Sequence, residues 1–264
     1  MKNNLLYPKY SLYLQTNVLK ITIMNRIACV EDIDRRIKEI WDKPYMKELP
    51  SWVSGRRYRY ADPIKADLLI TGINPSFRKD KDNKDLPDEL RHGPAKVNFT
   101  LTKYDNYWGP LSKMIDDDLK GCFDYLDIFH FWEKDQVKLK KQILCKGESG
   151  ILFIADELNL TQHIIEDVIK PKLILVKNKE SWAYWGKIDG YVWMGYEFDK
   201  VKDFPCGELC KIIGLQSKDR IAPEIEETCL KGCYVLFSKH INQFTKREER
   251  PTSDLLKKIL NNYF

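Results

Sequence analysis

Short apolar runs recur along this chain, separated by stretches in which apolar and polar residues alternate at helical spacing. Four segments each contain a short run of consecutive apolar residues, and they span residues 66–72 (ADLLITG), 123–131 (FDYLDIFHF), 173–178 (LILVKN) and 233–240 (CYVLFSKH). Runs of this length with little polar interruption are typical of strands that are buried on both faces of a sheet. The pattern therefore predicts four interior strands.

The stretches between these runs predict mostly helices. Apolar residues recur at helical spacing in residues 31–46, 106–119 after Pro110, 160–172 up to Pro171, 181–187 and 252–264, where Thr252 or Ser253 is the N-cap. Residues 189–201 (DGYVWMGYEFDKV) favour a hairpin or an edge strand. Residues 47–66 are predicted to be an irregular loop rich in arginine and tyrosine, and residues 77–100 a solvated loop.

The alternation of strands and helices indicates an α/β fold. Buried strands joined by helices favour a parallel sheet that is covered on both faces. We therefore predict a three-layer α/β/α sandwich around a central four-stranded parallel sheet. With 264 residues and 43% hydrophobic content, the chain suits one large domain. Residues 31–264 are assigned to that domain, and residues 1–30 to a loosely structured N-terminal extension.

The carboxyl ends of the predicted strands carry the residues of chemical interest, because open α/β sheets bind ligands there. Asn74 follows the first strand and precedes Pro75, which restricts Asn74 to extended geometry. An amide held in that way can bind a water molecule through its carbonyl and its NH2 group. Gly72 and Ser76 leave room for a close backbone approach. Alternatively, the Asn74 side chain only caps its own turn.

Three further polar residues end the other predicted strands. His240 follows the fourth strand and titrates near neutral pH, so it can donate a hydrogen bond to a developing anion. The alternative for His240 is a surface residue without a catalytic role. His130 and Asn178 end the second and third strands, where each can either contact the edge of a nucleobase or cap a helix.

Composition and charge narrow the classes of protein that remain. The formal net charge is +5 and the pI about 8.6, which is mildly basic and leaves room for a local anion-binding groove. Candidates for phosphate contacts are Arg56, Arg57, Arg59, Lys239, Lys246 and Arg247. The chain contains no GxGxxG, Walker, GxSxG or HExxH motif, so dinucleotide chemistry, nucleotide hydrolysis and serine hydrolysis have no support.

The cysteines and the N-terminal sequence bear on location and on metals. An odd count of 7 cysteines and the lack of an apolar leader favour a reduced, cytoplasmic protein that does not enter a membrane. Two C-x3-C pairs, 206–210 and 229–233, leave a metal site open as an alternative. Tetrathiolate sites usually have tighter spacing, and a cysteine that begins a buried strand usually packs as a small hydrophobe, so we predict no metal and no cofactor.

The first strand end and the segment after it resemble a known enzyme family. GINPS (72–76), followed by NYWGPL (106–111), resembles the uracil-DNA glycosylase superfamily over roughly residues 60–260. The likeness is greatest to the mismatch-specific and single-strand-selective branches, whose first motif reads Gly-hydrophobic-Asn-Pro-Gly. Ser76 replaces the last glycine of that motif, and no proline follows His240. The resemblance implies a glycosylase fold with a four-stranded parallel sheet between helices.

The resemblance also implies an activity and a set of site residues. The activity is hydrolysis of the N-glycosidic bond of uracil, or of a related damaged or mispaired base, in base-excision repair. Asn74 would position the attacking water and His240 would support the departing base. The implied substrate-binding residues are Gly72, Pro75, Ser76, Tyr107, Trp108, His130, Ser238 and Lys239. The missing proline after His240 leaves the alternative of a non-catalytic nucleic-acid-binding protein with the same fold.

The expected partner is DNA, in duplex or single-stranded form, bound by a monomer with the target base flipped out. Flipping leaves a gap in the base stack that an apolar side chain can fill. Candidates for that wedge are Ile241 and Phe244. Candidates for stacking on the flipped base are Tyr104, Tyr107 and Phe77.

Overall fold

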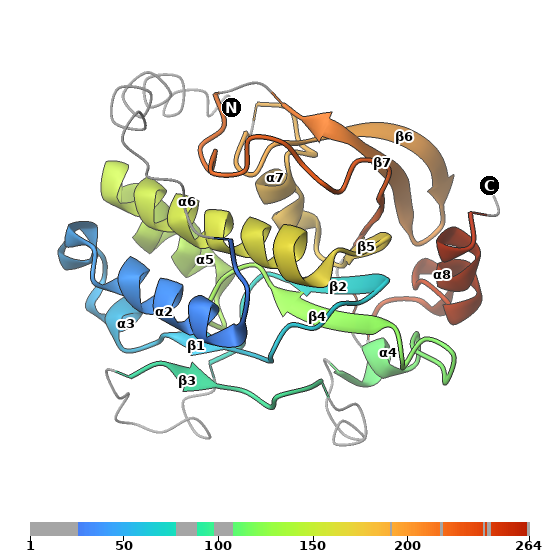
Figure 1. Cartoon of the computed structure of the whole chain (residues 1–264), viewed down its shortest axis with the longest axis horizontal. Helices are drawn as coiled ribbons and strands as arrows, with labels where there is room; N and C mark the ends of the chain where they lie inside the picture. Colours follow the sequence, from blue (N-terminus) through green and yellow to red (C-terminus); the bar gives the residue numbers. More distant parts are fainter. Residues whose placement is uncertain are drawn as a thin grey trace.

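A six-stranded mixed sheet with helices on both faces forms the centre of the molecule (Figure 1). The computed structural model describes residues 26–77, 89–97, 108–190, 192–216, 219–239, 241 and 244–262. The order of the strands across the sheet is β4-β2-β5-β8-β7-β6. The general α/β class predicted from the sequence is therefore observed.

The four predicted strands are adjacent in this sheet and mutually parallel. They are β2 (Leu68–Gly72), β4 (Phe123–Asp127), β5 (Leu173–Val176) and β8 (Tyr234–Ser238). Each strand is shorter than its apolar run. The second run ends as a strand at Asp127, so His130 is not at a strand end as predicted.

The sheet is larger than the predicted four strands and is not purely parallel. Strands β6 (Tyr196–Phe204) and β7 (Gly207–Leu215) form an antiparallel hairpin, and β7 pairs with β8. Residues 189–201 were predicted to form a hairpin or an edge strand, and β6, which begins at Tyr196, is the edge strand of this sheet. The hairpin itself lies further along the chain than predicted, and β7 was not predicted. Gly207 has a φ of 157°, and a Cβ at this position would lie 2.2 Å from the carbonyl oxygen of Phe237. The close contact between β7 and β8 therefore depends on glycine.

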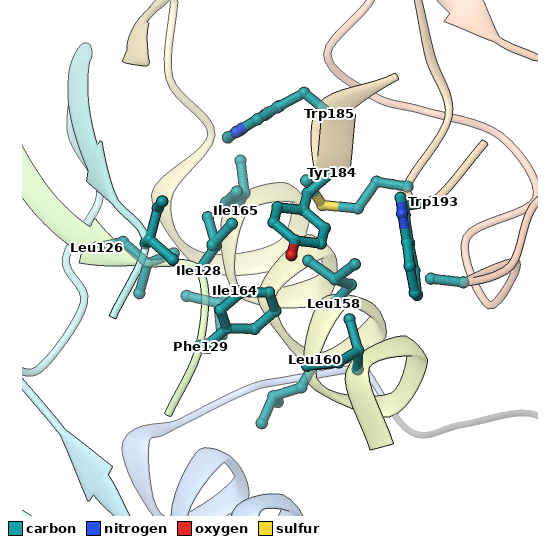
Figure 2. Close-up of a cluster of buried hydrophobic side chains, with 14 of the residues drawn as sticks. Leu126, Ile128, Phe129, Leu158, Leu160, Ile164, Ile165, Tyr184, Trp185 and Trp193 are labelled. Atoms are coloured by element: carbon teal, nitrogen blue, oxygen red, sulfur yellow. The ribbon is translucent and has the colours of Figure 1, made fainter. Parts of the chain in front are cut away.

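Each face of the sheet packs against its own set of helices. One face packs on α2 (Val30–Trp41), α6 (Glu148–His163) and α7 (Trp182–Trp185). Figure 2 shows part of this core, where Leu126, Ile128 and Phe129 meet Leu158, Ile164 and Tyr184. The opposite face packs on α4 (Trp108–Ser112) and α8 (Ser253–Leu260). Helices therefore lie on both faces of a sheet that is six-stranded and mixed, not the predicted four-stranded parallel sheet.

The predicted helices exist, but several of their boundaries differ. Helix α2 ends at Trp41, before Pro44, and α4 begins at Trp108 instead of after Pro110. Helix α6 begins at Glu148, twelve residues earlier than residue 160, and continues as a π-helix, η6 (Ile164–Ile169). Almost every α6 side chain is buried, so the amphipathic period that marks a surface helix is absent. Thr252 caps α8 as predicted, accepting a hydrogen bond from the Leu255 N–H.

The remaining elements are short. They are η2 (Pro44–Lys47), α3 (Ser51–Ser54), β1 (Tyr58–Arg59), β3 (Arg91–His92), α5 (Gln136–Lys138), η4 (Leu139–Ile143), η5 (Leu144–Lys146), η7 (Lys179–Ser181) and η8 (Arg247–Glu249). Strands β1 and β3 pair with each other, so the predicted loops 47–66 and 77–100 contain a small two-stranded sheet. None of the helices in the described ranges is both long enough and apolar enough to cross a bilayer.

Candidate functional site

The register of the parallel strands aligns four buried residues in a row at the carboxyl edge of the sheet. Gly72 of β2 is the partner of Asp127 of β4. Val176 pairs with Thr71 on one side and with Phe237 on the other, so the next residue, Lys177, lies level with Gly72 and Ser238. Alternation along the strands places this row on the face that carries Tyr125. We call Asp127, Gly72, Lys177 and Ser238 the edge row.

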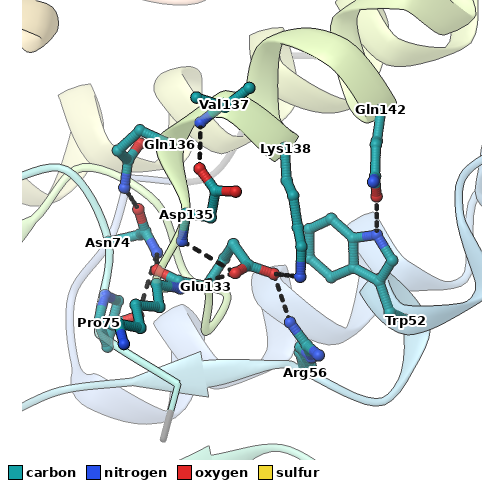
Figure 3. A network of polar contacts seen from close by, with 11 residues as sticks. Trp52, Arg56, Asn74, Pro75, Glu133, Asp135, Gln136, Val137, Lys138 and Gln142 are labelled. Carbon is teal, nitrogen blue, oxygen red and sulfur yellow. Dashed lines mark hydrogen bonds and ion pairs between the residues drawn. The ribbon is translucent and has the colours of Figure 1, made fainter.

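Asn74 lies two residues beyond the edge row, and its carboxamide has one fixed orientation (Figure 3). The NH2 group donates to the Glu133 carbonyl oxygen at 2.6 Å and to the Pro75 carbonyl oxygen at 3.0 Å. The Oδ1 atom accepts a hydrogen bond from Nε2 of Gln136 at 2.5 Å. The side chain is half-buried. The NH2 group is thus committed to the protein, and Oδ1 keeps one lone pair for another donor. The expectation that both amide groups hold water is wrong for the NH2 group.

Glu133 anchors the segment that orients Asn74. Its backbone N–H donates to the Pro75 carbonyl oxygen, which ties the two loops together. Its buried carboxylate accepts from Nη1 of Arg56 at 2.5 Å and from Nζ of Lys138 at 3.1 Å. The guanidinium of Arg56 also lies 4.1 Å from the ring centroid of Phe77. These contacts, which Figure 3 shows in part, hold the loop after β4 against the loop after β2.

Gln136 owes its position to the start of α5. The Asp135 side chain caps this helix by accepting from the Val137 N–H at 2.8 Å. Gln136 is therefore fixed in the first turn, where its amide reaches Asn74. Gln136 and Glu133 were missed from the sequence because they lie 62 and 59 residues from Asn74. Glu133 does follow the second apolar run, after Trp132, and that position at a predicted strand end was the signal that could have found it.

Asp127 and Lys177 form a buried pair of ionisable groups within the edge row. The Tyr125 hydroxyl donates to Oδ1 of Asp127 at 2.7 Å, and Nζ of Lys177 lies 5.8 Å from the centroid of the same tyrosine ring. Burial raises the pKa of Asp127 to about 6. Burial lowers the pKa of Lys177 to about 7, an effect that the charge of Asp127 opposes. Groups perturbed in this way often mark functional sites.

The sequence contains a feature that could have located Asp127 and Lys177. Both residues interrupt or follow an apolar run at a strand end, in FDYLD and in LILVKN. A charged residue at that position either reaches solvent or is buried at the carboxyl edge. Here both side chains are buried, with Asp127 5% and Lys177 2% exposed.

The other predicted site residues lie in different environments. Gly72, Pro75 and Ser238 are buried, and the Ser238 hydroxyl donates to the Lys239 carbonyl oxygen. Ser76 and Lys239 are exposed. Trp108 is half-buried, with its ring centroid 4.8 Å from that of Tyr125, beside the edge row.

His130 and Asn178 do not face a common site. His130 is buried, its backbone N–H donates to Glu157 of α6, and Nδ1 of its ring lies 3.4 Å from the same carboxylate without a well-aligned hydrogen bond. Asn178 caps η7 by accepting from the Glu180 N–H at 2.9 Å, which bears out the capping alternative. Tyr104, Tyr107 and His240 lie outside the described residues.

Two of the arginines predicted to contact phosphate are instead paired with acidic side chains of the protein. One of the two side chains predicted to fill the gap in the base stack is buried. Arg59 is buried and pairs with Asp34 at 2.8 Å and with Asp62 at 2.5 Å, so it is not available to a phosphate. Arg56 is paired with Glu133. Ile241 is fully buried, whereas Phe244 is 82% exposed. The exposed basic residues near the end of β8 are Lys239, Lys246 and Arg247.

The C-x3-C pairs do not form a cluster. In the described part of the chain, no three His, Cys, Asp or Glu side chains lie close enough together to hold a metal ion. Cys206, Cys210 and Cys233 are buried, and Cys229 is exposed. The Cys210 thiol contacts Lys187 and Glu208 instead of another cysteine.

Comparison with known proteins identifies no relative. No family model matches the chain, and the searches of curated proteins and of solved structures gave no match. The interpretation of the site therefore depends on its geometry.

Proposed function

We propose that this protein is a DNA glycosylase that hydrolyses the N-glycosidic bond of uracil, or of a related damaged or mispaired base. The observation that carries the proposal is the Asn74 carboxamide, held in one orientation beyond the end of β2 with one acceptor position left on Oδ1. A carboxamide fixed in this way can hold a water molecule in a defined direction. Four adjacent parallel strands, with Asn74 following a central one, support a glycosylase-like sandwich.

Hydrolysis of the glycosidic bond requires little more at the sugar than a water molecule held in the right orientation. As the bond to the base breaks, positive charge builds on the sugar and negative charge on the base. Asn74 cannot act as a base, but a water molecule held by its Oδ1 suffices because the sugar cation is highly reactive. A donor aimed at the base oxygen stabilises the departing anion, and removal of one such donor typically costs about 2.7–4 kcal/mol. His240 is our candidate for that donor.

DNA binding follows from the same proposal. A base must leave the duplex before its glycosidic bond can be reached, which costs a few kcal/mol and least for mispaired bases. Phe244 is the exposed apolar candidate to fill the gap, and Lys239, Lys246 and Arg247 are candidates for phosphate contacts. We propose that the protein acts as a monomer, without a cofactor and in the cytoplasm.

The same geometry also favours a second candidate function, a nucleic-acid-binding protein without catalysis. The Asn74 NH2 group and one lone pair of Oδ1 are used within the protein, which also suits a purely structural role for this residue. That function predicts salt-dependent binding to DNA that is unchanged in the Asn74→Ala variant and is not accompanied by base release.

A labelled oligonucleotide that contains uracil distinguishes the two functions. We expect the wild-type protein to release free uracil from U:G, U:A or single-stranded substrates. We expect Asn74→Ala to lower the rate by about 100-fold, since misplacing a reacting group by about 1 Å has an effect of that size. DNA binding without base release would favour the non-catalytic function.

A further inference from the structure

Most of the excess positive charge of the chain lies in one segment beside the candidate site. Residues 134–146 contain five lysines and one aspartate, so their net charge is +4, whereas the whole chain has a net charge of +5. The segment includes α5, η4 and η5, and it starts next to Asn74, because Gln136 donates to Oδ1 of Asn74 at 2.5 Å. Positive charge concentrated in this way attracts polyanions to that part of the surface.

The lysines of this segment differ in whether the protein already uses their charge. Lys138 is half-buried, and its Nζ pairs with the Glu133 carboxylate at 3.1 Å (Figure 3). Other lysines of the segment are exposed and form no ion pair with any residue in the described ranges: Lys134, Lys141 and Lys146. They differ in this from exposed basic residues such as Arg35 and Lys43, which pair with acids at 2.9 and 2.7 Å. The three charges are therefore available to an anion from outside the protein.

The segment is held in one orientation by Trp52 of α3. Nζ of Lys138 lies 5.8 Å from the centroid of the Trp52 ring, and Oε1 of Gln142 accepts a hydrogen bond from the Trp52 Nε1–H at 2.7 Å. Figure 3 shows both side chains reaching the same indole. From Gln136 to Lys146 the segment extends about 15 Å at the helical rise of about 1.5 Å per residue. This length matches roughly four nucleotides of a duplex strand, which are spaced about 3.4 Å apart along the axis.

We propose that Lys134, Lys141 and Lys146 bind phosphate groups of a DNA strand whose target nucleotide lies at Asn74. This inference rests on the proposed function in taking DNA as the partner, and it adds a phosphate-binding surface separate from the basic residues beyond β8. Exposed lysines suit this role because their flexible ammonium groups bind a phosphate as point charges. Phosphate contacts fix the position of a strand and read no sequence, so this surface holds the strand against Asn74 whatever its bases.

The composition of the segment favours DNA over an anionic membrane. Helical segments that bind membranes insert several apolar side chains below the headgroups. Here Leu139 and Ile143 are buried in the core, and Val137 is the one exposed aliphatic side chain among the described residues of the segment. A partner that presents phosphates without an apolar layer fits this surface best.

The salt dependence of DNA binding tests the proposal. A short fluorescein-labelled oligonucleotide, single-stranded or duplex, is titrated with the full-length protein at several salt concentrations, and binding is followed by fluorescence anisotropy. Replacing Lys134, Lys141 and Lys146 together by alanine should reduce the slope of log K against log salt, because three phosphate contacts are lost. We expect a reduction of about 2.1 for single-stranded DNA and about 2.7 for duplex DNA. Replacing the same three residues by arginine should keep the wild-type slope, since arginine retains the charge.

A matched control removes the same charge from another part of the surface. Lys65, Lys170 and Lys231 are exposed and precede β2, β5 and β8, at the edge of the sheet opposite Asn74. Their joint replacement by alanine should leave the slope as in the wild type. An equal loss in both alanine variants, or no loss in the first, overturns the proposal. Binding to phosphatidylserine vesicles that depends on the first three lysines, while DNA binding does not, also overturns it.

The outcome is separable from that of the proposed function, because DNA binding and base release are measured apart. Release of uracil with an unchanged slope in the first alanine variant refutes only this surface. A reduced slope without release of uracil supports this surface and refutes only the glycosylase.

Discussion

The Asn74 carboxamide cannot be exchanged for a carboxylate without changing its surroundings, because two carbonyl oxygens face its NH2 group. The nearer of them, from Glu133, lies 2.6 Å from Nδ2. Part of this residue's setting is predictable from sequence, since Pro75 restricts the backbone before it. The contacts from Glu133 and Gln136 come from a loop some 60 residues away, and no local pattern indicates them.

Asn74→Asp tests this orientation. The substitution places a carboxylate oxygen against the carbonyl oxygens of Glu133 and Pro75 and removes two donated hydrogen bonds. We expect a loss of about 1–3 kcal/mol in the free energy of unfolding, measured by urea denaturation, together with slower base release. Asn178→Asp is the matched control, because Asp caps η7 as well as Asn does. An Asn74→Asp variant as stable as the wild type would show that the observed orientation is not required.

Lys177 is expected to lower the stability of the folded chain near neutral pH. Its pKa is about 7 when folded, against an ordinary value of 10.5. Between these values the unfolded chain binds a proton that the folded chain does not, so this group's contribution to stability rises with pH across that window. Below pH 7 the penalty is fully present.

We therefore expect replacement of both groups, Asp127→Leu together with Lys177→Met, to stabilise the protein at pH 7 by about 1–4 kcal/mol, because no uncompensated buried charge is left behind. The gain over the wild type should shrink as the pH rises towards 10. Thermal unfolding of both proteins across this pH range measures the difference, with Lys179→Met as the exposed control. A gain that does not change with pH would contradict the lowered pKa of Lys177.

At the scale of elements, how well a helix or strand could be predicted from the sequence depends on which of its faces are buried. The four parallel strands are continuous apolar runs and were located correctly, because both of their faces lie inside. Helix α6 is buried on almost all sides, so its first three turns have no helical period to detect. The hairpin β6–β7 joins the sheet through β8, and that pairing depends on backbone hydrogen bonds that carry no side-chain pattern.

Gly150 tests the contact between α6 and the helical segment that carries Gln136. A Cβ on Gly150 would lie 2.0 Å from the carbonyl oxygen of Ile143, the last residue of η4. We expect Gly150→Ala to destabilise the fold by about 1–3 kcal/mol and to slow base release, because η4 continues directly from α5. Gly121→Ala is the control, since a Cβ there has nothing within 4 Å. Equal unfolding midpoints for the two variants in urea would contradict the tight packing of α6 on η4.

At the scale of the whole molecule, the net charge of +5 is less informative than the distribution of the charged groups. Arg56 and Arg59 are neutralised by acidic side chains, although the sequence placed them in a basic loop. Composition cannot show such pairing, because Arg59 and Asp34 are 25 residues apart and meet only through the fold. Lys246 and Arg247, beyond β8, remain exposed.

The salt dependence of DNA binding tests this distribution. If Lys246 and Arg247 each contact one phosphate, replacing both by Ala should reduce the slope of log K against log salt by about 1.4–1.8, depending on whether the DNA is single- or double-stranded. Arg59→Ala should lower stability and leave the slope unchanged. A reduced slope in Arg59→Ala would show that this arginine reaches the DNA despite its two carboxylate partners.

Release of a free base is the most direct test of the central claim that Asn74 directs water to a sugar carbon. An oligonucleotide with radiolabelled uracil is incubated with the wild type, Asn74→Ala and Asn178→Ala, and the released base is separated and counted. We predict release by the wild type and by Asn178→Ala, and a loss of about 100-fold for Asn74→Ala. No release from U:G, U:A and single-stranded substrates, or equal release by Asn74→Ala, would contradict the claim.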